Sequence, residues 1–160
     1  MREQGYEVID LKGTPVVTLD RPDALLMKRL PVFELAVEMD AIISVPVLKT
    51  HDQLEITLGL KNMKGLVDDR TKRLFHQEGV IEGCVDLCRA LPPAFTVVDA
   101  VVGQEGMGPL YGLPVEMGLV IAGCDPVAVD AVGGAVMGFR PEEVPITVLA
   151  ARQGLGTMDE

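Results

Sequence analysis

A chain of 160 residues, 48% of them hydrophobic, is long enough to bury the core of one domain and too apolar to be disordered. Its formal net charge of −10 argues against nucleic-acid binding, because that function needs a basic face that displaces counterions. No stretch reaches the roughly 18 apolar residues of a membrane span, and the first residues lack the apolar core of a signal peptide. We therefore expect a cytoplasmic protein without membrane contact.

The first 40 residues predict short elements. Tyr6–Leu11 and Pro15–Leu19 are expected to form strands, separated by a turn at Lys12-Gly13. Ala24–Leu30 is expected to be another strand, and a short helix should follow around Phe33–Met39.

Ala41–Leu48 is almost entirely apolar, which is typical of a strand that is covered on both faces. Pro46 removes one hydrogen-bond donor from it, so the strand should lie at a sheet edge or be bulged there.

The segment that follows, Leu54–Leu66, predicts a helix. Thr57, Lys61 and Lys64 are spaced i, i+4 and i+7, which would place them in one polar stripe. An apolar stripe at the same spacing would face the core.

The second half alternates strands and helices and carries a glycine-rich loop. The expected elements are a helix over Gln77–Leu91, a strand over Phe95–Val102, a loop over Gly103–Gly112, a strand over Val115–Ala122, a helix from Asp125-Pro126 through Met137 and a helix over Glu142–Gln153. Asp125 would cap the helix that begins at Pro126. The whole pattern predicts an α/β domain with a mixed, largely buried sheet and helices on both faces.

Positive charge is concentrated in one segment. Between Lys49 and His76 there are six Lys and Arg residues and four acids, so this segment has a net charge of +2 and the remainder has −12. A cationic segment in an acidic protein can attract small anions. The alternative is a solvated loop with mixed charges.

Several motifs resemble the DUF362 family, whose members have no assigned function and are often linked to iron–sulphur proteins. The matching segments are Pro46-Val-Leu-Lys-Thr-His51, Thr57-Leu-Gly-Leu-Lys-Asn-Met-Lys-Gly65, Val98-Asp99-Ala100, Gly106-Met-Gly-Pro-Leu-Tyr-Gly112, Gly123-Cys-Asp-Pro-Val-Ala-Val-Asp130 and Gly154-Leu-Gly156. Family members usually carry a further N-terminal α/β segment, and many add ferredoxin-type cysteine clusters. Residues 1–160 are therefore expected to be a single domain of this family that is truncated at its N-terminus.

The expected site lies behind the strand that ends near Leu48. His51 is a candidate acid/base or metal ligand, a choice that the resemblance favours, and the alternative is an ordinary loop histidine. Lys61 is the second candidate catalytic residue, and with Lys49 and Lys64 it would bind a carboxylate or phosphate.

Three further kinds of residue complete the candidate site. Asn62 and Thr57 would donate hydrogen bonds to the anion. Gly106 and Gly108 would allow a ligand to approach the backbone closely, although turn geometry explains glycines equally well. The motifs identify neither a cofactor nor a metal.

Carboxylates and cysteines leave alternatives open. Asp99 and Asp130 lie in apolar segments, where a buried carboxylate needs a partner, and they are either structural or functional. The three cysteines form neither a disulfide framework nor a CxxC motif, so we expect them to act as small buried apolar residues.

Two functions follow from these observations. The first is an enzyme domain, metal- or redox-linked, that binds a small anionic substrate or cofactor. The second is a non-catalytic module that docks onto an iron–sulphur partner through its cationic segment. An incomplete sheet would also allow the chain to form a homodimer.

Overall fold

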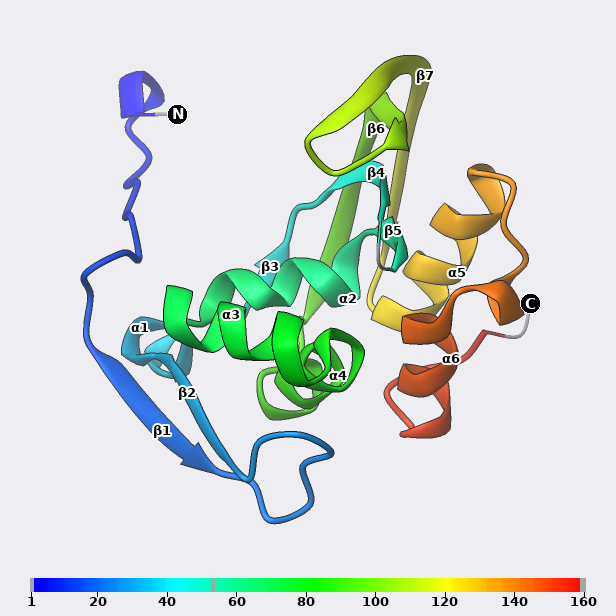
Figure 1. Ribbon diagram of the computed structural model, residues 1–160. Coiled ribbons are helices and arrows are strands. Elements are labelled where there is room, and N and C mark those ends of the chain that lie inside the picture. The colour runs from blue at the N-terminus through cyan, green and yellow to red at the C-terminus, as the bar shows by residue number, and fades with distance from the viewer. Residues whose placement is uncertain (1, 53, 159–160) are drawn as a thin grey trace.

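The computed structural model describes residues 2–52 and 54–158 (Figure 1). In chain order the elements are η1 (Arg2–Gln4), β1 (Val16–Asp20), β2 (Arg29–Phe33), α1 (Glu34–Glu38), β3 (Ile43–Ser44), β4 (Val47–His51), β5 (Glu55–Thr57), α2 (Gly59–Asn62), η2 (Met63–Leu66), α3 (Asp69–Glu78), α4 (Val80–Ala90), β6 (Phe95–Met107), β7 (Tyr111–Gly123), α5 (Pro126–Val136), η3 (Pro141–Glu143) and α6 (Pro145–Arg152), where η marks a 3-10 helix.

A mixed sheet of five strands organises the described part of the chain. β3 and β4 pair in parallel with successive parts of β6, β5 pairs antiparallel with β4, and β7 pairs antiparallel with β6. β1 and β2 form a separate antiparallel pair. In the view of Figure 1, α2, α3 and α4 lie to one side of the β6–β7 hairpin, and α5 and α6 lie to the other. The predicted α/β fold with a mixed sheet is confirmed.

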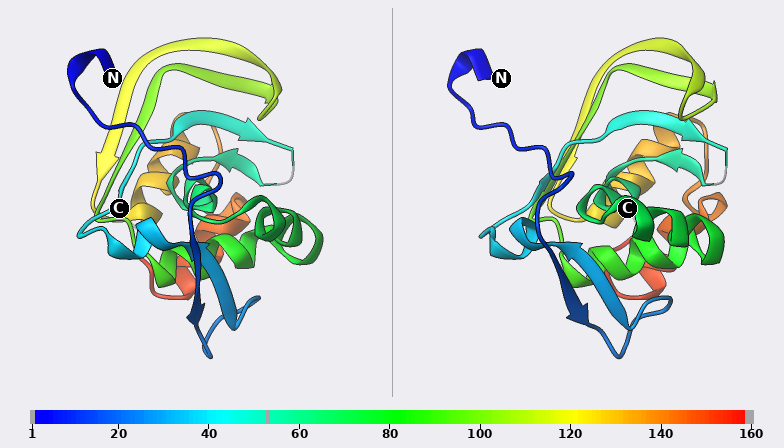
Figure 2. Two further views of the ribbon diagram at one scale, coloured as in Figure 1. Left: turned by 90° about the vertical axis from the view of Figure 1, so that its left-hand side faces the viewer. Right: turned by 60° about the vertical axis from the view of Figure 1, so that its left-hand side comes forward.

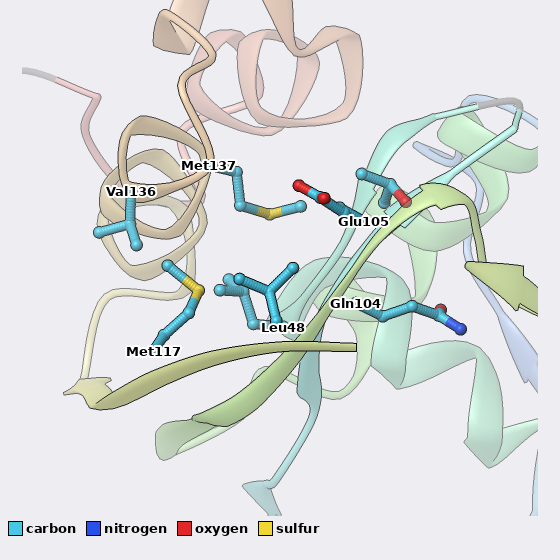
Figure 3. A pocket seen from close by; sticks show the side chains of 8 residues that line it. Leu48, Gln104, Glu105, Met117, Val136 and Met137 are labelled. Carbon is cyan, nitrogen blue, oxygen red and sulfur yellow. The ribbon is translucent and has the colours of Figure 1, made fainter. Parts of the chain in front are cut away.

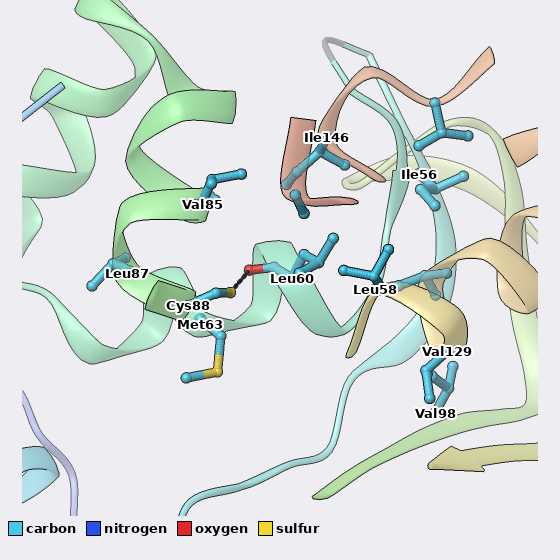
Figure 4. Close-up of a cluster of buried hydrophobic side chains, with 14 of the residues drawn as sticks. Ile56, Leu58, Leu60, Met63, Val85, Leu87, Cys88, Val98, Val129 and Ile146 are labelled. Carbon is cyan, nitrogen blue, oxygen red and sulfur yellow. Dashed lines mark hydrogen bonds between the residues drawn. The ribbon is translucent and has the colours of Figure 1, made fainter. Parts of the chain in front are cut away.

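The hydrophobic core fills the space between the sheet and the helices (Figure 4). Leu58 and Leu60 are fully buried at its centre, and Val98 of β6, Val129 of α5 and Ile146 of α6 are at most 4% exposed. Each large apolar side chain buried in this way contributes roughly 1.5–3 kcal/mol. Burial of this cluster is therefore the main force that holds α2 between the sheet and the C-terminal helices.

The core does not cover the whole sheet. Val47, Asp99 and Val120 occupy neighbouring positions across β4, β6 and β7, so they share one face. Val47 is 42% exposed and Val120 is 62% exposed. The sheet is thus less fully covered in this region than the apolar sequence predicts.

Among the early elements, Pro15–Leu19 and the helix near Phe33 are confirmed as β1 and α1, with small shifts. The strand predicted over Tyr6–Leu11 is wrong, because these largely exposed residues pair with no strand in the described part of the chain. The strand predicted over Ala24–Leu30 is largely wrong as well, because its first residues form turns and β2 begins only at Arg29. The strand predicted over Ala41–Leu48 is interrupted between β3 and β4, at Val45-Pro46, as the proline suggested.

The helix predicted over Leu54–Leu66 is partly wrong. Its first third is β5, which pairs with β4, and only the remainder is helical, as α2 followed by η2. The sequence Leu-Glu-Ile-Thr-Leu alternates apolar and polar residues and therefore suits a strand as well as a helix. Thr57 consequently does not lie in a helical stripe with Lys61 and Lys64.

Two later predictions also need correction. The segment before Gln77 contains a helix that the pattern missed, α3, and the predicted second helix begins at Val80. The glycine-rich stretch is not a loop, because β6 continues to Met107 and β7 begins at Tyr111. The resulting long hairpin arches over β4 and β5 (Figure 2). The capped helix after Asp125 is confirmed, since the Asp125 carboxylate accepts hydrogen bonds from two backbone amides of α5.

Candidate functional site

Two paired strands place the first site residues on one face. Val47, Lys49 and His51 alternate along β4, so their side chains point to the same side of the strand. In β5, Thr57 lies opposite Lys49, and Glu55 lies opposite His51. The pairing of β4 with β5 therefore brings a lysine, a histidine, a carboxylate and a hydroxyl together.

Helical segments add three further basic side chains. Lys61 ends α2, Lys64 lies in η2, and His76 lies near the end of α3. The Nζ of Lys64 contacts Nε2 of His76. Lys49, His51, Lys61, Lys64 and His76 are called the cationic cluster below.

Burial and neighbouring charge keep His51 neutral. The side chain is 3% exposed, and burial, followed by the charge of Lys61, lowers the pKa of His51 to about 4. Asp52 opposes this shift, because its Oδ1 lies 3.0 Å from Nδ1 of His51. At neutral pH the imidazole is therefore uncharged, with Nδ1–H donating to Asp52 and the lone pair on Nε2.

The pKa values of Lys61, Lys64 and His76 are also lowered. Burial, followed by the charge of Lys64, lowers the pKa of Lys61 to about 8. Burial likewise lowers the pKa of Lys64 and the pKa of His76, on which the nearby lysines act in the same direction. The fold thus pays an electrostatic cost to hold like charges together, and a bound anion would relieve it.

The hydroxyl of Thr57 is a buried polar group of this face. The hydroxyl oxygen of Thr57 is buried and makes no hydrogen bond to any described residue. A buried hydroxyl without a partner costs free energy, so its position beside Lys49 suits a ligand oxygen.

Three predicted site residues, Asn62, Gly106 and Gly108, interact with parts of the chain outside the cationic cluster. Asn62 is exposed, and its Nδ2 donates to Oγ of Ser44 at 2.9 Å, which ties α2 to β3. The carbonyl oxygen of Gly106 accepts a hydrogen bond from Oγ1 of Thr50, and Gly108 packs directly against the backbone of Thr50. Gly108 therefore allows the β6–β7 hairpin to approach β4, whereas Gly106 has a left-handed backbone with φ 80, which favours glycine.

Two cavities lie along that hairpin. The first, of about 230 Å³, is lined mainly by apolar side chains, and the carboxylate of Glu105 and the thioether of Met137 point into it (Figure 3). The second, of about 450 Å³, lies between Asp52 and the hairpin turn. Neither cavity is lined by His51 or Lys61, although Asp52, which lines the second, is the partner of His51.

Sequence reasoning missed two acidic residues beside the cluster. Asp52 orients His51, and its position directly after the histidine was the only available signal. Glu55 has a left-handed backbone with φ 61, and its buried Oε2 has no partner among the described residues. No sequence signal indicates that strain, because only glycine, asparagine and aspartate favour this conformation.

The remaining candidates divide between surface and core. Asp99 is exposed and accepts a hydrogen bond from the backbone of Val101, so the expectation that it is buried is wrong. Cys84 and Cys88 are buried, as predicted, and burial raises the pKa of Cys84 to about 12, whereas Cys124 is exposed. Among the described residues, no group of three or more His, Cys, Asp or Glu side chains is placed to hold a metal ion.

Comparison with known proteins identifies relatives of the chain. A family described as a domain of unknown function (DUF362) matches residues 1–135. A thylakoid-associated protein of Synechocystis sp. is 30% identical over 155 residues, which is 93% of this chain and 46% of that protein. The chain thus spans less than half the length of this relative. No solved structure matches it significantly. In the described part, no helix is both long and apolar enough to cross a membrane.

Proposed function

The chain belongs to the DUF362 family, a domain of unknown function, and we propose that it binds a small carboxylate or phosphate anion at the cationic cluster. The observation that carries this proposal is the grouping of three partly buried lysines, in which Lys49 and Lys64 both act on the charge of Lys61 and Asp52 is the one carboxylate among the groups that act on it. A structural role alone would favour compensation of these charges. A bound anion would supply the negative charge that the lysine side chains otherwise lack around them.

The ligand would contact the face shared by β4 and α2. The ammonium groups of Lys49, Lys61 and Lys64 supply positive charge, and the hydroxyl of Thr57 supplies a hydrogen bond. All three lysines are at least partly buried. Partial burial strengthens each charge–charge interaction relative to an exposed surface pair.

His51 gives this site the means for proton transfer. With Nδ1–H directed at Asp52, Nε2 is the acceptor atom of the ring. A bound anion raises the pKa of His51 from about 4, because a nearby negative charge favours the imidazolium form. We propose that His51 acts as acid or base on the bound anion, in an enzyme of which this domain is one part.

The docking alternative stays a prediction. A docking surface for an acidic protein would present its cations to solvent on an exposed face. His51 is buried instead, and Lys61 is only partly exposed. This arrangement favours a small ligand over a protein partner. The iron–sulphur partner and the homodimer remain predictions.

The proposal is tested by titrating the purified chain with phosphate, sulfate and acetate at constant ionic strength, with chloride as the reference anion. We expect a saturable heat of binding by calorimetry and a rise in the melting temperature. A ligand at 100 times its Kd stabilises the folded state by about 2.7 kcal/mol.

Lys12→Met is a matched control variant, because Lys12 is an exposed lysine outside the cluster, with 70% of its side chain accessible. Lys12→Met removes one positive charge, as a substitution of a cluster lysine would, but it should bind the anions as the unmodified chain does. Equal responses to chloride and to all three anions would overturn the proposal.

A further inference from the structure

The helix that carries Lys61 begins at an unusual junction. α2 has only four residues, too few to be stable alone, and its own N-cap residue, Leu58, offers no side-chain hydrogen bond. Two backbone amides at its start are satisfied by Asp130 of α5, which lies 71 residues away in the sequence. Oδ1 accepts from the amide of Gly59 at 2.7 Å, and Oδ2 accepts from that of Leu60 at 3.2 Å.

We infer that Asp130 is a positioning residue, whose carboxylate fixes the start of α2 against α5 and thereby places the ammonium group of Lys61 in the anion site. This inference rests on the proposed function. Lys61 follows Gly59 by two residues within the same helical turn, so a shift of the helix start displaces it directly.

The packing around the junction is tight. Asp130 is 1% exposed, and a Cβ atom on Gly59 would lie 2.8 Å from Cγ2 of Thr96 and 3.0 Å from Oδ1 of Asp130. Glycine is therefore required for α2 to approach both β6 and α5. Burial and two hydrogen bonds to the α2 backbone leave the carboxylate little freedom.

The electrostatic surroundings of the Asp130 carboxylate are those of a buried group that is held by hydrogen bonds. Burial raises the pKa of Asp130 to about 7, while the two backbone hydrogen bonds oppose this shift. Burial raises the pKa of both Cys84 and Cys88 on α4, and the negative charge of Asp130 acts on both in the same direction. A negative or hydrogen-bonding group at the start of a helix is favourable, which suits Asp130 to its position at α2.

Asp86 provides a matched control for Asp130. It is also buried, at 3% exposure, and also accepts hydrogen bonds from backbone amides, those of Leu25, Leu26 and Met27. It holds the segment before β2, however, and does not contact α2 through these bonds. Asp→Asn at either position replaces one acceptor atom by a donor and should lower the melting temperature of the chain.

The experiment compares sulfate affinity in the unmodified chain, Asp130→Asn and Asp86→Asn by calorimetry. We expect the affinity of Asp130→Asn to fall at least about 10-fold, while that of Asp86→Asn changes less than about 2-fold, because only the first substitution displaces Lys61. Equal affinities in both folded variants would overturn the positioning role. Absence of sulfate binding in the unmodified chain would instead refute the proposed function.

A second pair of variants keeps the test decisive if Asp130→Asn does not fold. Gly59→Ala pushes the start of α2 away from Asp130, whereas an alanine at Gly134 has its nearest contact at an ordinary 3.6 Å. We expect Gly59→Ala alone to weaken sulfate binding. Unchanged binding by a folded Gly59→Ala chain would contradict the inference.

Discussion

Replacing Lys61 by methionine separates the effect of the cationic cluster on stability from its effect on anion binding. Methionine has a similar length and no charge, so the variant removes one of the like charges and keeps the packing. Lowering the pKa of Lys61 from 10.5 to about 8 corresponds to at most about 3 kcal/mol of unfavourable free energy. Lys61 is partly exposed and solvent screens its charge, so we expect a net gain in stability of about 1 kcal/mol.

The sign of this effect follows from proton linkage. The folded-state pKa of Lys61 is lower than the ordinary lysine value of 10.5, so the folded state binds fewer protons between pH 8 and pH 10.5. The penalty is therefore fully present below pH 8 and is lost as the pH rises towards 10.5. The advantage of Lys61→Met should be largest at neutral pH and fade in the same range.

The assay is thermal or urea unfolding at pH 7, with and without saturating sulfate. In the absence of sulfate, a gain of about 1 kcal/mol raises the melting temperature by roughly 2–4 °C for a chain of this size. In its presence the unmodified chain gains further stability and Lys61→Met does not. The reasoning is refuted if Lys61→Met is the less stable protein, or if it keeps the full response to sulfate.

Three further predictions concern pH and packing. Sulfate affinity should fall by about 5-fold between pH 8 and pH 9 as Lys61 loses its proton, and Lys61→Arg should abolish this fall in calorimetric titrations. Gly83→Ala should destabilise the chain by about 1–3 kcal/mol in urea unfolding, because its Cβ would lie 2.6 Å from the ring of the fully buried Phe75. Glu55→Gly should raise the free energy of unfolding by about 1 kcal/mol, because glycine tolerates the left-handed backbone at φ 61.

Each of these has a result that would contradict it. A fall in affinity that persists in Lys61→Arg would assign the titration to another group. Gly134→Ala is the control for Gly83→Ala, and an equal loss in both variants would argue against the clash with Phe75. A less stable Glu55→Gly chain would mean that the carboxylate of Glu55 contributes more than its backbone strain costs.

Local sequence determined several features of this protein. The α/β class, the apolar strand from Phe95 and the capped helix after Asp125 were all predicted, because hydrophobic periodicity and capping residues act within a few positions. The concentration of cations between Lys49 and His76 was also apparent from the sequence alone. These signals depend on neighbours along the chain.

Tertiary structure decided the rest. Leu54–Thr57 fits a helix or a strand by its own pattern, and pairing with β4 makes it β5. The glycine-rich stretch becomes a hairpin because Gly106 and Gly108 meet Thr50 of the neighbouring strand. Asp130 accepts a hydrogen bond from Gly59, 71 residues away in the sequence. Burial is the largest cause of the shifted pKa values of Asp130, Lys61 and His51. Desolvation and long-range contacts exist only once the chain has folded, so no local pattern could predict them.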